Sequence, residues 1–158
     1  MKLRLVCVGK LSEAFLREGA EEYAGRIQRY LPLEIIELKE EKQGGKKPDP
    51  RRIRDLEAER ILARIPDGAF VLVLDENGRS LSSEGFSELL GRHMVQGTPE
   101  LVAVIGGAYG LGERVKQRGD LVLSLSAMTF THQMARLFLF EQIYRGLTIL
   151  RNEPYHNR

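Results

Sequence analysis

Five short apolar runs, separated by longer stretches of mixed polarity, limit the folds open to this chain more than any other feature. The run at residues 70–75 is almost continuously apolar, which is typical of a strand covered on both faces. The other four runs have similar lengths and lead into polar or glycine-containing segments. We therefore expect five strands, at residues 3–9, 33–39, 70–75, 101–107 and 121–125.

Helical patterns fill the stretches between these runs. Pro32 ends the first, Asp49 opens the second, and Ser82 or Ser83 can cap the third through a side-chain oxygen. A turn at residues 76–79 closes the third strand. The predicted helices cover residues 12–31, 49–65 and 82–93, and a last one begins near residue 131. This alternation predicts an α/β fold with a mostly parallel sheet and helices on both faces.

Length and composition limit the number of domains and the kind of partner. A chain of 158 residues with 42% hydrophobic residues can form one ordinary core, and we expect a single domain over residues 1–158. The formal net charge is only +2, so a nucleic-acid surface requires a local cluster of charge. Cys7 is the one cysteine, which excludes an internal disulfide. With no apolar run long enough to span a membrane, we expect a soluble, cytoplasmic protein.

Most polar groups that we assign to chemistry lie in residues 121–158. A strand there leads through small and hydroxyl residues into a helix, and in open α/β sheets ligands bind at such loops. Glu141 and Arg145 stand four residues apart, so the simpler alternative for them is an ion pair on the helix surface. Pro154 stiffens the segment that carries Tyr155 and His156, for which the simpler alternative is a frayed terminus.

Three other features have a plain interpretation beside a functional one. The glycines at 106, 107 and 110 can form a tight turn or admit a ligand, but their spacing does not fit a dinucleotide fingerprint. The three histidines are scattered without the spacing of metal ligands, so we expect no metal site. A basic segment can be a solvated loop or a phosphate contact; its members are Lys42, Lys46, Lys47, Arg51, Arg52 and Arg54.

Four motifs in the second half of the chain become specific when they are taken together. They are IGGAYGL at residues 105–111, LSLSAMTFTHQMAR at 123–136, EQIYRGLTI at 141–149 and PYH at 154–156. This combination resembles the SPOUT methyltransferases, and within them the small RlmH-type family. The resemblance runs from the opening MKLRLVCVGK to the closing NEPYHNR.

The resemblance implies a fold and a cofactor. The fold is a trefoil-knotted α/β knot, in which the C-terminal segment threads through a loop, although knots are rare exceptions. The cofactor is S-adenosylmethionine, whose adenine ring backbone amides and small side chains can enclose. At Gly106 we expect an added side chain to enter this pocket. The implied pocket residues are Leu74, Gly106, Leu125, Ser126, Ala127, Met128, Thr129 and Phe130.

The family methylates N3 of a pseudouridine in large-subunit (23S) ribosomal RNA, and the resemblance implies the same reaction here. The ring nitrogen must lose its proton, so an arginine can stabilise the anion and a histidine can accept the proton. Which group is the base stays open. The catalytic candidates are His132, Arg145, Tyr155 and His156.

Expected partners follow from size and from one helical segment. A small chain with few phosphate contacts favours action on the assembled ribosome, and neither DNA nor a membrane is expected. Four large apolar residues at 137–140 cover more than one side of a helix, which predicts a homodimer, as the resemblance also implies, with each site completed across the interface. Two alternatives remain: a non-enzymatic RNA-binding or ribosome-associated factor, and a SPOUT methyltransferase acting on transfer RNA.

Overall fold

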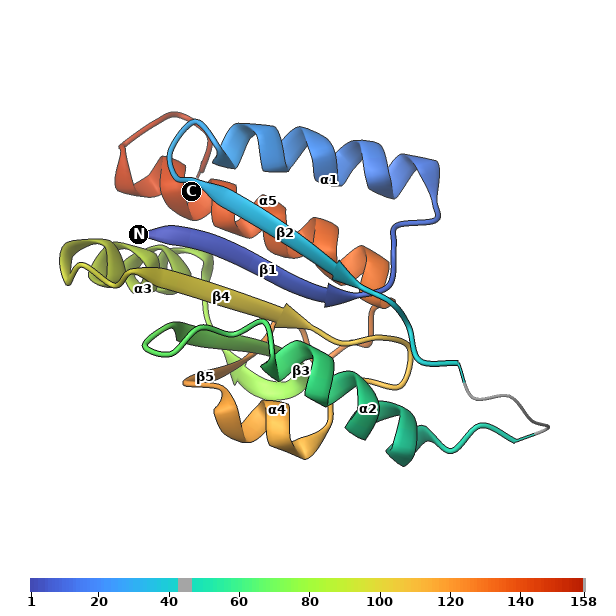
Figure 1. Ribbon diagram of the computed structural model, residues 1–158. Helices are drawn as coiled ribbons and strands as arrows, with labels where there is room; N and C mark the ends of the chain where they lie inside the picture. Colours follow the sequence, from blue (N-terminus) through green and yellow to red (C-terminus); the bar gives the residue numbers. More distant parts are fainter. Residues whose placement is uncertain (43–46, 158) are drawn as a thin grey trace.

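Strands and helices alternate along the part of the chain that the computed structural model describes, residues 1–42 and 47–157 (Figure 1). The predicted strands are all present, and four of them end within two residues of the predicted bounds. The elements are β1 (Lys2–Val8), α1 (Ala14–Ile27), β2 (Leu33–Leu38), α2 (Pro50–Leu62), β3 (Phe70–Ser80), α3 (Ser83–Val95), β4 (Glu100–Ile105), α4 (Glu113–Arg118), β5 (Leu121–Ser124) and α5 (His132–Leu150).

All five strands form one parallel sheet in the order β2-β1-β4-β3-β5. Helices α1, α3 and α5 cover one face, while α2 and α4 cover the other (Figure 1). The predicted α/β fold, with a parallel sheet and helices on both faces, is therefore confirmed. The threading of the C-terminal segment through a loop stays a prediction.

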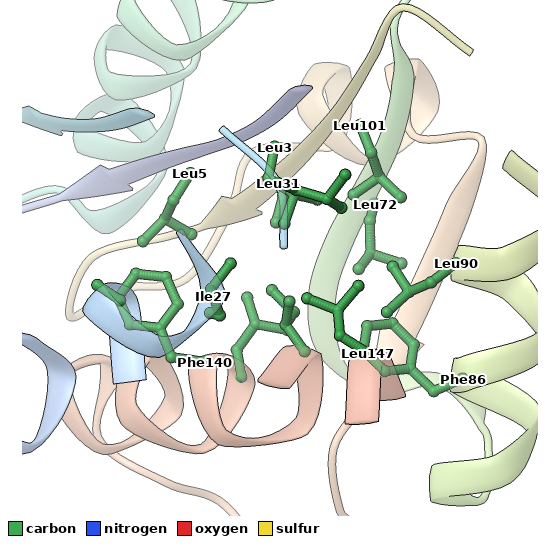
Figure 2. Packing of buried hydrophobic residues seen from close by; sticks show 14 of the residues in the cluster. Leu3, Leu5, Ile27, Leu31, Leu72, Phe86, Leu90, Leu101, Phe140 and Leu147 are labelled. Carbon is green, nitrogen blue, oxygen red and sulfur yellow. The ribbon is translucent and has the colours of Figure 1, made fainter. Parts of the chain in front are cut away.

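Alternate residues of the central strands fill two different cores. On β1, Leu3 and Leu5 point toward α1, α3 and α5, whereas Val6 and Val8 point toward α2 and α4. Figure 2 shows the first core, where Phe140 of α5 lies beside Leu5 of the sheet, and Leu147 of α5 lies beside Leu90 and Phe86 of α3. Two buried faces explain why these strands read as nearly continuous apolar runs.

The third strand corrects one sequence prediction. The segment 76–79 does not close the strand, because β3 continues to Ser80. Leu74 and Arg79 both pair with Leu123, so the residues between them leave the ladder as a bulge. A Cβ on Gly78 would lie 2.7 Å from the carbonyl oxygen of Val122, and glycine is therefore required where the bulge crosses β5. The turn signal was real, but tertiary pairing with β5 resumes after it.

Helix α5 lies between α1 and α3, and small residues allow the close approach. An added Cβ on Gly19 of α1 would lie 3.0 Å from Leu137, and one on Gly146 would lie 3.0 Å from Leu90 of α3. The Ser87 hydroxyl donates to the carbonyl oxygen of Gly146 at 2.7 Å. This packing holds the C-terminal half of α5 firmly beside α3.

Local signals explain where most helices begin. Asp49 accepts hydrogen bonds from the first turn of α2, and Ser82, rather than Ser83, accepts one from Gly85 at the start of α3. Thr131 caps α5, close to the predicted start. The six residues of α4 were not predicted, since so short a helix carries little periodicity.

Candidate active site

A cavity of about 310 Å³ opens beside the carboxyl ends of β3 and β5, between α3 and α5. Its volume lies at the lower end of the range for small-molecule sites. One wall is apolar and the other carries hydroxyl, amide and carboxylate groups. The lining residues are Leu81, Ser82, Ser83, Phe86, Leu123, Ser124, Leu125, Phe130, Phe138, Glu141 and Gln142.

The loop predicted to bind the cofactor borders this cavity. Leu125 and Phe130 line it, and the ring of Phe130 packs edge-on against Phe138 with 4.9 Å between centroids. The Ser126 hydroxyl accepts from the amide of Met128 at 3.0 Å, which makes the loop turn. Thr129 donates to the Glu76 carboxylate at 2.5 Å and so ties the loop to the bulge of β3. Ala127 lies within this turn, and the Met128 side chain is exposed.

Leu74 and Gly106 lie on neighbouring strand ends, outside the described lining of the cavity. Leu74 is the last residue of β3 before the bulge, and Gly106 directly follows β4. A Cβ on Gly106 would lie 2.9 Å from the backbone of Gly110 and from Leu111. The expectation that a side chain there would enter a ligand pocket is therefore wrong, because it would strike the turn itself. Cofactor contact by the backbone of these residues stays a prediction.

Arg145 is held by Glu141, which itself lines the cavity. The Arg145 Nη2 donates to Glu141 Oε1 at 2.5 Å, and Nε donates to the same oxygen at 3.1 Å. This hydrogen bonding raises the pKa of Arg145 above its already high value, so the side chain stays charged. Both side chains are mostly buried, and the Tyr155 ring lies 4.8 Å from the guanidinium carbon. The pair is thus more than an ion pair on an exposed helix face.

The C-terminal tail packs against α5 and α1, so it is not frayed. The Tyr155 hydroxyl donates to Glu141 Oε1 at 3.0 Å and lies 3.2 Å from the Tyr23 hydroxyl of α1. Its ring packs edge-on against Tyr144, with 4.7 Å between centroids. Burial, followed by the hydrogen bonds with Tyr23 and Glu141, raises the pKa of Tyr155. At neutral pH this phenol is a donor and an orienting group, not a base.

His156 connects the tail to α3. Its Nδ1 lies 3.2 Å from Arg145 Nη1, and its Nε2 lies 3.2 Å from Glu84 Oε1 in the first turn of α3. The structure therefore brings three of the four predicted catalytic residues into one hydrogen-bonded cluster. Glu141, which binds Arg145, lines the cavity, and so does Ser83, the residue that precedes Glu84.

His132 is the exception, since it lies at the opposite end of α5. Thirteen residues of helix separate it from Arg145, a distance of roughly 20 Å at 1.5 Å per residue. Its Nε2 is buried, has no hydrogen-bond partner within the described chain, and lies 3.9 Å from Glu40 Oε1. Within one protomer it cannot act on the same atom as Arg145.

Several residues of the cluster were missed or underrated in the sequence. Glu141 appeared only as the ion-pair partner of Arg145, and Tyr23 was not singled out as a functional residue. Glu84 gave no functional signal at all. The i, i+4 spacing of Glu141 and Arg145 next to a cavity-forming loop was the one pattern that pointed to this region.

The basic segment is only partly described. Arg51 and Arg52 are exposed on the first turn of α2, and Arg54 Nη1 donates to the carbonyl oxygen of Tyr109 at 3.4 Å. Lys46 lies outside the described residues. The described part of the segment is a solvated basic surface next to the glycine turn.

The described residues contain neither a metal-binding cluster nor a membrane-spanning helix. Within residues 1–42 and 47–157, no group of three or more His, Cys, Asp or Glu side chains is arranged to hold a metal ion. The helices in that part of the chain are too short or too polar to cross a membrane.

Comparison with known proteins identifies the family. At 62% identity over all 158 residues, the chain is similar to the ribosomal RNA large subunit methyltransferase H of Syntrophotalea carbinolica, and both chains are covered completely. The protein of the same name from Trichlorobacter lovleyi is 51% identical, with 99% of this chain and 100% of the relative covered.

One solved structure is also similar, the SpoU methyltransferase AviRb from Streptomyces viridochromogenes in complex with AdoMet. The match has a TM-score of 0.47 and 14% identity, and it covers 91% of this chain and 57% of the other. The model of the family described as "Predicted SPOUT methyltransferase" matches residues 1–156. With nearly the whole chain matched by that model, the protein belongs to the SPOUT methyltransferase family.

Proposed function

We propose that this protein transfers a methyl group from S-adenosylmethionine to N3 of a pseudouridine in large-subunit ribosomal RNA, on the assembled ribosome in the cytoplasm. The family and the names of two relatives, matched over their full length, support methylation of large-subunit ribosomal RNA. The single structural observation that carries the proposal is the position of the Arg145 cluster beside the cavity, joined to it by Glu141.

The cavity and its loop fit the proposed cofactor. Leu81, Leu125 and Phe130 offer an apolar surface for a flat ring, and the hydroxyls of Ser82 and Ser83 offer polar partners. When bound, S-adenosylmethionine supplies an activated methyl group on sulfur. The protein then has to align that group with the acceptor nitrogen and help the nitrogen lose its proton.

Arg145 is suited to stabilising the anion that forms when N3 loses its proton. It stays charged, and Glu141 and the Tyr155 ring fix its orientation from two sides. A fixed cation in a partly buried site stabilises developing negative charge better than one in water. We assign the role of base to His156, because Tyr155 is a donor and Arg145 is permanently charged.

We also propose a homodimer with a site completed by the second copy, and a knotted chain. Of the apolar residues 137–140, the core takes Leu139 and Phe140, while Phe138 stays 36% exposed. Phe15 of α1 also faces outward and is 66% exposed. Phe130, which packs against Phe138, adds to this exposed apolar surface, and Met128 in the same loop is exposed as well. A second copy covering this surface would also offer a reason for His132 to belong to the site.

The test is methyl transfer from labelled S-adenosylmethionine to separated ribosomes, large subunits, free ribosomal RNA and transfer RNA. We expect label in the large-subunit RNA of ribosomes and much less in the free RNA. Label in transfer RNA would favour the alternative substrate. Binding to ribosomes without transfer of label, together with no rise in melting temperature when S-adenosylmethionine is added, would favour a non-enzymatic binding factor.

A further inference from the structure

His156 lies between a fixed donor and a fixed acceptor, and this determines which of its nitrogens carries the proton. Arg145 Nη1, which lies 3.2 Å from Nδ1, can only donate, so Nδ1 must be the acceptor and unprotonated. Glu84 Oε1, which lies 3.2 Å from Nε2, accepts, so Nε2 carries the hydrogen. The ring is therefore a neutral Nε2–H tautomer while both contacts are made.

We propose that Glu84 is a positioning residue, which holds His156 in this tautomer so that Nδ1 is the nitrogen that receives the proton from the substrate base. The inference rests on the proposed methyl transfer and adds to it a residue on α3. A carboxylate beside one imidazole nitrogen has this role in Ser-His-Asp enzymes, where it fixes the tautomer and stabilises the charged ring.

The position of Glu84 suits such a role because the start of α3 is tied to α5. The neighbouring Ser83 hydroxyl donates to Gln142 Oε1 at 2.7 Å, and both residues line the cavity. Deeper in the same interface, Ser87 donates to the backbone of Gly146. Glu84 is thus held at a fixed distance from the α5 residues that contact His156.

The proton and charge balance of the step is simple. Arg145 Nη1 shifts from His156 to an oxygen of the base next to N3, which frees the lone pair of Nδ1. The N3–H bond breaks and its proton passes to Nδ1, while N3 takes the methyl group and the methyl–sulfur bond breaks. The positive charge lost at sulfur reappears on the His156 imidazolium, beside the Glu84 carboxylate. The groups that face His156 are Arg145 and Glu84, with Glu141 and Tyr155 behind Arg145.

A purely local role for Glu84 is the alternative, since a carboxylate in the first turn of a helix also favours the helix dipole. Glu88 lies one turn further along α3 and is exposed. Glu88→Gln therefore removes the same charge from the same helix without touching His156, and it serves as the matched control.

The experiment compares Glu84→Ala, Glu84→Asp and Glu88→Gln with the wild-type protein by two measurements. Nitrogen-15 NMR of the imidazole rings reports the His156 tautomer without any substrate. Methyl transfer to ribosomes gives kcat and the KM for S-adenosylmethionine. We expect the Nε2–H signature in wild type and Glu88→Gln and its loss in Glu84→Ala. We expect kcat of Glu84→Ala to fall by on the order of 100-fold with KM within about twofold, and Glu84→Asp to recover most of the loss.

A wild-type kcat in Glu84→Ala, or an Nδ1–H tautomer in the wild-type protein, would overturn the inference. Glu84→Ala in a His156→Ala background should cost little more than His156→Ala alone, because Glu84 acts through His156. A further large loss there would also count against it. If wild-type protein transfers no methyl group at all, the proposed function fails, while the NMR result still decides whether Glu84 sets the tautomer.

Discussion

Arg136 and Arg145 lie on the same helix, and each is paired with a glutamate, yet they have different surroundings. Arg136 is 2% exposed; its Nη1 donates to Glu37 at 2.5 Å and its Nη2 to the carbonyl oxygen of Gly9 at 2.8 Å. Arg145 keeps a quarter of its side chain exposed, and its partners Glu141, Tyr155 and His156 are all side chains, of which Glu141 lines the cavity.

The difference distinguishes a structural ion pair from the pair that we propose to act in catalysis. Arg136 donates hydrogen bonds to Gly9, directly after β1, and to Glu37 of β2. It therefore fixes the first turns of α5 to the sheet. Its Nε has no partner in the described chain, but it is buried and out of reach of a ligand. Arg145 is bound by side chains alone, and a quarter of its own side chain is exposed. Pairing alone therefore says little about role, whereas the access of solvent to the pair says more.

The largest expected effect is on catalysis, and it comes from Arg145, the less buried of the two arginines. Arg145→Lys keeps the charge but loses the contact that two guanidinium nitrogens make with Glu141, so the orientation of the cation is no longer fixed. We expect methyl transfer to fall by about 100-fold to 1,000-fold, equivalent to about 3–4 kcal/mol of transition-state stabilisation, with a melting temperature near wild type. Arg151→Lys, on an exposed arginine just past the end of α5, is the control and should be active. A fully active Arg145→Lys protein would remove the distinction between the two arginines.

The next effect is on stability, and it comes from the buried arginine. Arg136→Ala leaves the Gly9 carbonyl and the Glu37 carboxylate without their partner. Breaking a buried pair costs about 3–5 kcal/mol, and since Glu37 is partly exposed we expect about 2–3 kcal/mol less free energy of unfolding in urea. The same change at Arg145 should cost about 1 kcal/mol or less, because a quarter of the Arg145 side chain is already exposed to water. Equal losses at both positions would contradict the structural assignment of Arg136.

The sequence predicted the fold far better than the site, for a physical reason. The spacing and the number of apolar residues in a segment depend only on neighbours along the chain, so the five strands and the start of α5 could be located. The continuation of β3 past its bulge could not, because it depends on pairing between Arg79 and Leu123 in another strand. The clash at Gly106 likewise comes from the fold of a turn, with Gly110 four residues later.

Contacts between residues distant in the sequence limited the prediction of the site even more than that of the fold. Arg145, Tyr155 and His156 lie within residues 141–156, and their common neighbourhood could be expected from a helix and a short tail. Glu84 lies 72 residues away from His156 in the sequence, and only the packing of α3 against α5 brings the two together. His132 looked equivalent to Arg145 in the sequence, but a helix of 19 residues places them at opposite ends.

The smallest expected effect comes from removing the Tyr155 hydroxyl. This change separates the contribution of the aromatic ring from that of the hydroxyl group at the Arg145 end of α5. Tyr155→Phe keeps the ring against Arg145 and Tyr144 but removes the bonds to Glu141 and Tyr23, so at pH 7 it should cost about 1 kcal/mol. Methyl transfer should fall by less than about tenfold, because Glu141 still holds Arg145.

The pH dependence of this loss tests its cause. The pKa of Tyr155 is raised in the folded protein, chiefly by burial, so its contribution to stability is complete below the ordinary tyrosine pKa of about 10 and is lost as the pH rises through the higher folded value. The wild-type free energy of unfolding should therefore fall toward that of Tyr155→Phe above pH 10. Tyr109→Phe, on an exposed tyrosine, should follow the wild-type curve. A gap between wild type and Tyr155→Phe that stays constant from pH 7 to about 11 would mean that the hydroxyl stabilises the tail without a shifted pKa.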